Sequence, residues 1–213
     1  MGRNAEKNAR DRAMRREQIL ETAFHVFAAN TIDSISMNEV ADACGVGIAT
    51  VYRYFSTKSA LVLAVNTWVW ENFTRAGIAA RDAGATTAAE DFAFYLDSFL
   101  ALYRSNRDAL RFNQFFNVYV QREGITREQL APYMTLIRGL EERFRRVYEK
   151  GRADGTLRTD APEREMFAAT LHLMLAAATR YAVGLVYLDG SDPEQELRLL
   201  KNMFLREYVP VSS

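Results

Sequence analysis

The sequence predicts an all-α protein, on two observations. Apolar side chains recur at spacings of three and four residues along most of the chain, which is the period of an amphipathic helix. The 213 residues include only 4 prolines and 11 glycines, while 49% are hydrophobic, so long helices are seldom interrupted and a core can form. The pattern favours about nine helices, with a three-helix helix-turn-helix domain at the N-terminus and a larger helical domain after it.

Residues 36–58 predict two short helices joined by a tight turn. Ser36 and Glu39 have the spacing of a capping box, which begins a helix. Gly45 can adopt the left-handed conformation that ends one. A second helix is expected over residues 47–54. Helix, glycine turn and helix in this order are the layout of a DNA-reading helix-turn-helix.

The second helix of this stretch carries side chains suited to DNA. Small, β-branched and hydroxyl side chains can approach base edges in a major groove, and a guanidinium can bind guanine. Phenols, hydroxyls and a lysine at a helix start suit phosphate oxygens. We therefore expect base contacts from Gly47, Ile48, Ala49, Thr50 and Arg53, and phosphate contacts from Ser36, Tyr52, Tyr54 and Lys58.

The residues from Gly45 to Phe55, followed by Lys58 and Leu61, resemble the signature of the tetracycline-repressor (TetR) family of bacterial transcriptional regulators. An upstream stripe of Ile19, Ala23 and Phe27 resembles the first helix of that family. The resemblance covers residues 15–65 and implies a homodimer that binds DNA and responds to a small molecule.

Two positions depart from the family pattern. The family usually has glycine where this chain has Thr31, and we expect the neighbouring Asn30 to make the turn, because asparagine tolerates the left-handed conformation. The position of Ile48 is usually polar, so part of the base contact would be apolar here.

The flanking sequence indicates how the chain is divided. Residues 1–12 are polar with a surplus of basic side chains, so we expect a flexible basic arm that touches DNA or, alternatively, a solvated tail. Residues 1–58 would form the DNA-binding domain and residues 59–213 the ligand-binding and dimerisation domain. A long helix over residues 57–81 joins them, and the resemblance implies that it transmits a ligand signal.

Aromatic side chains are concentrated in the middle of the chain. Bulky rings with a few hydroxyls suit a cavity for an apolar or aromatic small molecule, although ordinary core packing would use the same residues. That an effector pocket exists is implied by the family resemblance. We expect it to be lined by Phe99, Tyr103, Phe112, Phe116, Tyr119, Phe144 and His172.

The last two predicted helices carry long apolar seams. The first repeats at a 4-3-4-3 spacing, which is typical of a helix that packs against another, and the second begins after Asp192 as cap and Pro193 in the first turn. The two helices could form a four-helix bundle with their copies or bury against their own domain. We expect a dimer interface of Phe167, Leu171, Met174, Ala178, Tyr181, Leu197, Leu200 and Phe204.

Catalytic and metal-binding patterns are not found in the sequence. Neither of the two histidines lies in a nucleophile motif, and there is no phosphate-binding glycine loop or His/Cys cluster. We predict no enzyme activity, no metal and no cofactor. Net charge is zero, so affinity for DNA would come from a local patch.

Composition also bears on location. A single cysteine suits a reducing cytoplasm, the charged N-terminus is unlike a signal peptide, and the longest apolar run is interrupted by His172 and Arg180, so we expect no membrane segment. The sequence favours a cytoplasmic regulator, a repressor that a small apolar or aromatic effector releases from a palindromic operator on double-stranded DNA. The alternative is a helical small-molecule-binding or catalytic domain that does not bind DNA.

Overall fold

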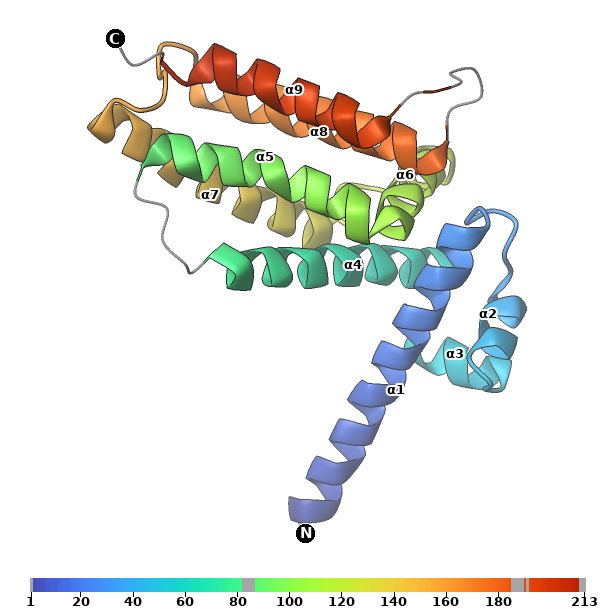
Figure 1. The fold of residues 1–213 in the computed structure, drawn as a ribbon. Coiled ribbons are helices and arrows are strands. Elements are labelled where there is room, and N and C mark those ends of the chain that lie inside the picture. The colour runs from blue at the N-terminus through green and yellow to red at the C-terminus, as the bar shows by residue number, and fades with distance from the viewer. Residues whose placement is uncertain (1, 82–86, 185–189, 191, 211–213) are drawn as a thin grey trace. The chain divides into compact units, whose positions relative to one another are not determined.

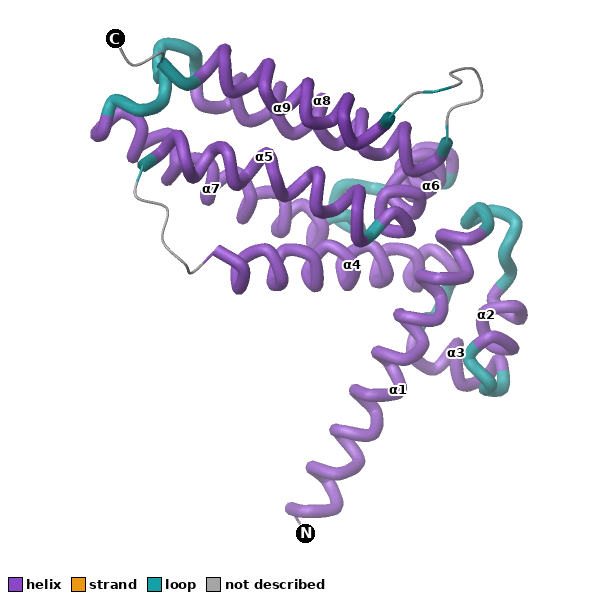
Figure 2. The backbone as a smooth tube through the Cα atoms, viewed as in Figure 1, coloured by secondary structure: helices purple, strands orange, loops and turns teal. Residues whose placement is uncertain are grey.

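The computed structural model is helical throughout the part of the chain that it describes (Figures 1 and 2). That part forms nine helices and no strand, which confirms the predicted all-α fold, and it comprises residues 2–81, 87–184, 190 and 192–210. The expected loop at 82–86 and the end of the first apolar seam at 185–188 lie outside the described residues.

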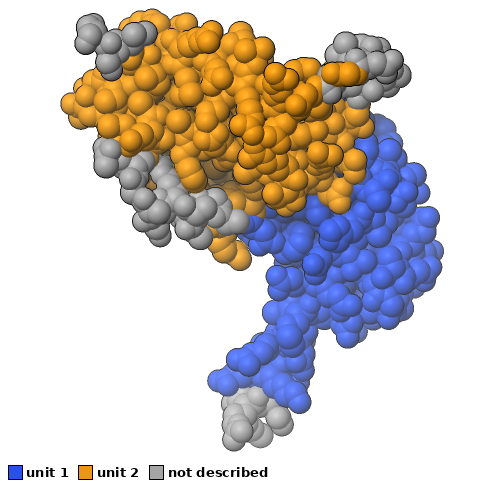
Figure 3. Space-filling view, in the orientation of Figure 1, with its two compact units in different colours: residues 1–72, 112–133 blue, residues 73–111, 134–213 orange. Residues whose placement is uncertain are grey.

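The chain divides into two compact units (Figure 3). Unit 1 comprises Met1–Asn72 and Phe112–Tyr133, and unit 2 comprises Phe73–Arg111 and Met134–Ser213. These units are defined by packing, whereas the predicted border at residue 58 concerns which part binds DNA and which binds a ligand. That division of function therefore stays a prediction.

Unit 1 is built from four N-terminal helical segments and a piece of a fifth that is distant in sequence. They are α1 (Gly2–Ala29), α2 (Met37–Ala43), α3 (Ile48–Tyr54), the first part of α4 (Lys58–Arg81) and most of α6 (Arg107–Arg122). Aromatic side chains of α6 belong to this core, because the Phe112 ring lies 5.9 Å from Phe24 and 6.4 Å from Phe27 on α1.

The predicted flexible arm is helical in the structure. Helix α1 starts at Gly2 rather than near residue 11. Side chains from Glu6 to Gln18 are exposed, so this part of the helix is not held by a core. Alanine, arginine, lysine and glutamate dominate the segment, and these residues have high intrinsic helix propensity. The prediction gave this propensity too little weight against the absence of buried side chains.

The turn from α1 to α2 is closed by hydroxyl groups and not by a left-handed asparagine. No described residue other than glycine has a positive φ, so the expectation for Asn30 was wrong. The Asn30 amide instead donates to the Val26 carbonyl at 2.9 Å. The Ser34 hydroxyl donates to the Thr31 carbonyl at 3.0 Å and so takes over the role expected of Asn30.

Unit 2 contains α5 (Ala88–Ser105), most of α7 (Ala131–Asp154), α8 (Glu163–Val183) and α9 (Pro193–Tyr208). Thr87 and Glu90 form a capping box at the start of α5, and Asp192 caps α9 as predicted. Thr126 and Gln129 form the two hydrogen bonds of a capping box before α7, although that helix begins only at Ala131.

The predicted dimer seam faces the interior of unit 2. Helix α8 packs against α5 and α9, and α5 also packs against α9 (Figure 1). Leu171, Tyr181 and Leu200 are half-buried. The other five predicted interface side chains are buried within the chain, which corrects their assignment to a partner contact: Phe167, Met174, Ala178, Leu197 and Phe204. The repeat spacing was real, but it reports packing on α5 rather than on a second copy.

The length and composition of α8 would also suit a membrane span, contrary to the expectation from sequence. Seven of its side chains, however, are buried, among them Met166, Met174 and Ala178, and its neighbours are α5 and α9. This is the environment of a core helix.

Two glycines of α7 provide a matched test of the packing of unit 2. A Cβ at position 151 would lie 2.5 Å from the Leu157 Cβ, whereas a Cβ at position 139 would meet no atom within 4 Å. We expect Gly151→Ala to lower the free energy of unfolding by about 1–3 kcal/mol through overpacking. Gly139→Ala should raise it by about 0.5–1 kcal/mol through helix propensity. Urea unfolding followed by circular dichroism measures both, and equal effects would contradict this packing.

Candidate nucleic-acid interface

Helix α2 begins with the predicted capping box. The Glu39 amide donates to the Ser36 hydroxyl at 3.2 Å, and the Ser36 amide and hydroxyl each donate to the Glu39 carboxylate at 2.7 Å. These bonds lower the pKa of Glu39, with the backbone bond as the largest cause. Because the folded-state pKa is depressed, the stabilisation is present at neutral pH and is lost as the pH falls. The Ser36 hydroxyl is thus engaged in the cap.

The turn between α2 and α3 depends on one left-handed residue. Gly45 has a φ of +66°, as the sequence predicts. The amides of Gly45 and Val46 donate to the carbonyls of Asp42 and Ala41, each at 3.0 Å. These bonds close the end of α2, so that α3 can start two residues later with Gly47 as its N-cap.

Two apolar side chains fix the rotation of α3. Val51 is fully buried and Phe55, at the C-cap, is 4% exposed. Successive helical residues are about 100° apart around the axis, so burying these two positions turns Ala49 and Arg53 outward. Both are exposed, Thr50 is partly exposed, and Ile48 lies closer to the buried side. The outward face therefore carries one small side chain, Ala49, and one charged side chain, Arg53.

Tyrosines lie on both sides of this face. Tyr52 is 50% exposed, and Tyr54 is partly exposed with its ring 5.6 Å from the Arg53 guanidinium carbon. The Arg53 guanidinium therefore stays at the surface and forms a cation–π contact with the Tyr54 ring. Arg53 is thus exposed beside the Tyr54 ring, and the roles of these side chains in base and phosphate contact stay predictions.

The lysine at the start of α4 is less free than the sequence suggests. Thr57 caps α4 as expected, by accepting from the Ala60 amide at 3.0 Å. The Lys58 ammonium is half-buried and donates to the Asp33 carbonyl at 3.4 Å. Burial lowers the pKa of Lys58, and the nearby carboxylate of Asp33 opposes that shift. A phosphate contact would have to compete with the Asp33 carbonyl.

A contact from α6 secures the same corner, and sequence analysis missed it. The hydroxyls of Ser59 and Tyr119 lie 2.9 Å apart, and the Arg122 guanidinium forms an ion pair with Asp33. Burial is the main cause that raises the pKa of Tyr119. Sequence spacing carries no signal of this corner, because the residues of each pair lie 60 or more positions apart.

Comparison with known proteins agrees with this geometry. Residues 19–65, which hold the whole helix-turn-helix, match the family described as "Bacterial regulatory proteins, tetR family". An HTH-type transcriptional regulator of Staphylococcus aureus strain bovine RF122 / ET3-1 is 38% identical over 56 residues, which are 26% of this chain and 30% of the relative. The chain thus matches about three tenths of the length of this curated relative.

Solved structures extend the likeness to the rest of the fold. A transcriptional regulator from Saccharomonospora viridis, solved in complex with choline, superposes with a TM-score of 0.76 at 17% identity over 93% of this chain and all of that one. The fatty acid degradation regulator FadR from Bacillus halodurans gives 0.72 at 14% identity, over 89% of this chain and 94% of its own. Residues 19–65 thus carry the match to the tetR family, and the solved structures show that the fold is shared.

The matched family and these relatives are described as regulatory proteins or transcriptional regulators. The two solved neighbours are too distant in sequence to say more than that the fold is shared.

The predicted effector residues are divided between the two units. Phe112, Phe116 and Tyr119 belong to unit 1, where the Phe112 ring packs on α1 and the Tyr119 hydroxyl meets Ser59. His172 is exposed on α8, which corrects its assignment to a cavity. The remaining three are buried in unit 2, where they stay candidates: Phe99, Tyr103 and Phe144.

The two glycines that flank the turn provide a test of its backbone. Neither would place a Cβ within 4 Å of another atom, so a difference between them reports conformation alone. We expect Gly45→Ala to lower the free energy of unfolding by about 1–2 kcal/mol, because alanine disfavours a left-handed φ. Gly47→Ala, at an extended N-cap where glycine is preferred to alanine, should cost less, about 0.5–1 kcal/mol. Thermal unfolding measures both, and a larger loss at position 47 would contradict the assigned turn.

Proposed function

We propose that the chain is a DNA-binding transcriptional regulator in which α3 lies in the major groove. The observation that carries this proposal is the outward face of α3. It exposes Ala49 and Arg53, with Thr50 partly exposed, while Val51 and Phe55 are buried. Small side chains permit close approach to base edges, and the guanidinium can bind guanine at two atoms. Tyr52 and Tyr54 then meet phosphates on either side.

The regulator acts as a homodimer that binds a palindromic operator on double-stranded DNA. The partner is a second copy, held through the outer face of α8 and α9 instead of the predicted seam. Four apolar side chains are about half exposed there: Leu173 (53%), Val183 (48%), Leu199 (58%) and Met203 (57%). Large apolar side chains gathered on two adjacent helices favour association over exposure to water.

The effector binds inside unit 2 and has an apolar or aromatic body with one or two polar groups. The interior of this unit is lined by aromatic rings, among which Tyr95 and Phe144 have centroids 5.5 Å apart. The Tyr95 and Thr179 hydroxyls are buried and have no hydrogen-bond partner among the described residues. Burial raises the pKa of Tyr95, so its phenol stays protonated and able to donate. Unmet polar groups of this kind favour a ligand that satisfies them.

Effector binding releases the dimer from DNA, so the chain acts as a repressor. It acts in the cytoplasm. Two reading helices must enter successive major grooves about 34–36 Å apart, and a ligand that favours another spacing lowers the affinity for the operator. The alternative, a helical binding domain that never meets DNA, gives no account of the exposed Arg53 between two phenols.

The test begins with selection of binding sites from a randomised duplex pool. We expect the selected sites to be palindromes with half-sites about one helical turn apart. Anisotropy titrations should show affinity that falls steeply with salt, with a log–log slope of about −0.9 per phosphate contact. Failure to enrich any sequence, together with salt-independent binding, would support the alternative.

Substitutions at Arg53 and Lys58 separate base contacts from phosphate contacts. We expect Arg53→Ala to cost about 1–3 kcal/mol at the selected site and to relax its preference at one base pair. Lys58→Ala should weaken all sequences equally and reduce the salt slope by about 1. Arg146→Ala, an exposed arginine on α7 of unit 2, serves as the control and should bind as the wild type does. Identical losses for Arg53→Ala and Lys58→Ala would contradict the assigned roles.

Oligomeric state tests the proposed α8–α9 face. The double variant Leu173→Arg, Leu199→Arg should be a folded monomer by light scattering, since both side chains are exposed and arginine would place charge in the interface. Val118→Arg, which changes an apolar side chain of similar exposure on α6, should remain dimeric. A double variant that stays dimeric would place the interface elsewhere.

A further inference from the structure

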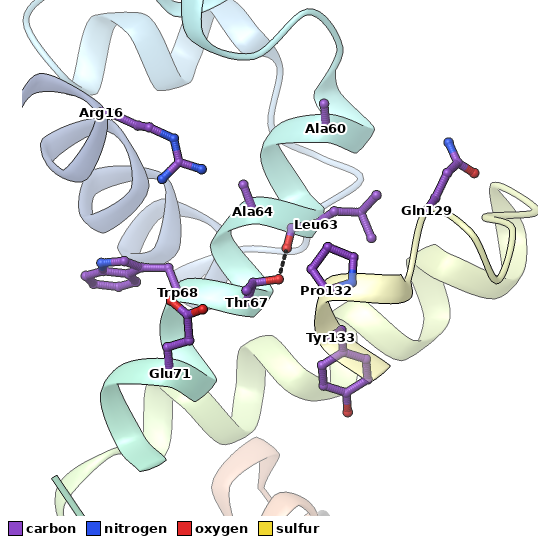
Figure 4. Close-up of a pocket in the computed structure, with 10 residues that line it drawn as sticks. All are labelled: Arg16, Ala60, Leu63, Ala64, Thr67, Trp68, Glu71, Gln129, Pro132 and Tyr133. Carbon is purple, nitrogen blue, oxygen red and sulfur yellow. Dashed lines mark hydrogen bonds between the residues drawn. The ribbon is translucent and has the colours of Figure 1, made fainter. Parts of the chain in front are cut away.

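Unit 1 contains a pocket of its own, separate from the outward face of α3. It has a volume of about 390 Å³, which is within the range of small-molecule sites. It is lined by α1, the first part of α4, Gln129 and the first turn of α7 (Figure 4). Its apolar part is formed by Leu63, Ala64 and Pro132. The pocket can therefore hold the apolar body of a small molecule.

An arginine and a glutamate, of opposite charge, border this pocket. Arg16 on α1 and Glu71 on α4 both line it, and both are exposed. Neither side chain forms an ion pair with another described residue. A ligand with both charges would satisfy both side chains.

The same pocket is lined by a tryptophan whose buried indole N–H has no hydrogen-bond partner among the described residues. This residue is Trp68, whose ring lies 6.0 Å from Phe24. A buried donor without an acceptor costs free energy, so native proteins usually supply one from protein, water or ligand. Because this nitrogen is closed off from the surface, the Trp68 ring offers the pocket apolar surface rather than a hydrogen-bond donor.

We propose that this pocket binds a small zwitterion with an apolar body, namely an apolar amino acid or a short apolar peptide. The carboxylate pairs with Arg16, the ammonium group pairs with Glu71, and the side chain covers Leu63, Ala64 and Pro132. A molecule with a single charge would form only one of these two exposed ion pairs and so bind more weakly. This site is distinct from the effector site proposed in unit 2.

One side chain that lines the pocket, Arg16, also contacts Phe55 at the end of α3. The Arg16 guanidinium carbon lies 5.4 Å from the centroid of Phe55, the buried residue that caps the C-terminus of α3. A carboxylate that draws the guanidinium toward the pocket acts on the same side chain that stacks on Phe55. Bound zwitterion can thus alter how firmly α3 is held.

Calorimetric titration of the full chain tests the site. The probes are L-leucine, L-phenylalanine and the dipeptide leucyl-leucine, compared with N-acetyl-leucine and leucine amide, in which one charge is removed. At least one zwitterion should bind with one site per chain. Loss of either charge should weaken binding by about fivefold, the contribution of one partly exposed ion pair. The two ligand classes differ in the distance between their charges, which is longer in the dipeptide than in a free amino acid. Which of them binds more tightly therefore tells whether the site takes an amino acid or a peptide.

Variants locate the site. Arg16→Gln and Glu71→Gln should each weaken the bound zwitterion by about fivefold, and Ala64→Leu, which fills the pocket, should abolish binding. Arg12→Gln, an exposed arginine one turn earlier on α1, should bind as the wild type does. Circular dichroism confirms that each variant is folded.

The proposal is overturned if no zwitterion binds at millimolar concentration, if the blocked compounds bind equally well, or if the Arg16 and Glu71 variants bind like the wild type. The readout is binding and not DNA affinity, so a failure here leaves the proposed regulator function intact, and a failure of DNA binding leaves this site intact.

Discussion

Burial of Val51 and Phe55 is the constraint on which the DNA-binding surface depends. A helix of seven residues is too short to be stable alone, so its position comes from these two anchors and from the turn before it. Once they are buried, the 100° step between residues leaves no choice about which side chains face outward. The exposure of Ala49 and Arg53 is thus a consequence of packing. A substitution that removed Phe55 from the core would leave the rotation of α3 less well defined.

The second constraint comes from a helix far along the chain. Ser59 meets Tyr119, and Asp33 meets Arg122, so the last turn of α6 contacts both the α1–α2 turn and the start of α4. Arg122 is half exposed, so its ion pair adds little stability. Asp33 is also the residue whose carbonyl accepts from the Lys58 ammonium group, so the two contacts meet at one residue.

Local signals made the helix-turn-helix predictable from sequence. The Ser36–Glu39 box, the left-handed Gly45 and the apolar pair in α3 each act within a few residues, and each is present in the structure. Long-range features were not predictable. The 4-3-4-3 seam of α8 could pack on a second copy or on α5, and periodicity cannot distinguish the two because both demand the same spacing. The structure shows that it packs on α5.

The prediction that the aromatic residues line one effector pocket was wrong for a related reason. Composition predicts that rings gather but not which helix they face, so Phe112 was assigned to an effector pocket although it packs on Phe24 and Phe27 of α1. The zwitterion pocket was equally invisible in the sequence, since its charges come from Arg16 and Glu71, on two helices that only the fold brings together.

The most direct test of the central claim is amide hydrogen exchange of the full chain with and without its selected DNA site. If α3 lies against nucleotides, exchange should slow most over residues 47–58, with a smaller change in the Ser36 cap. Slowed exchange confined to α5, α8 or α9, with residues 47–58 unchanged in the presence of saturating DNA, would contradict it.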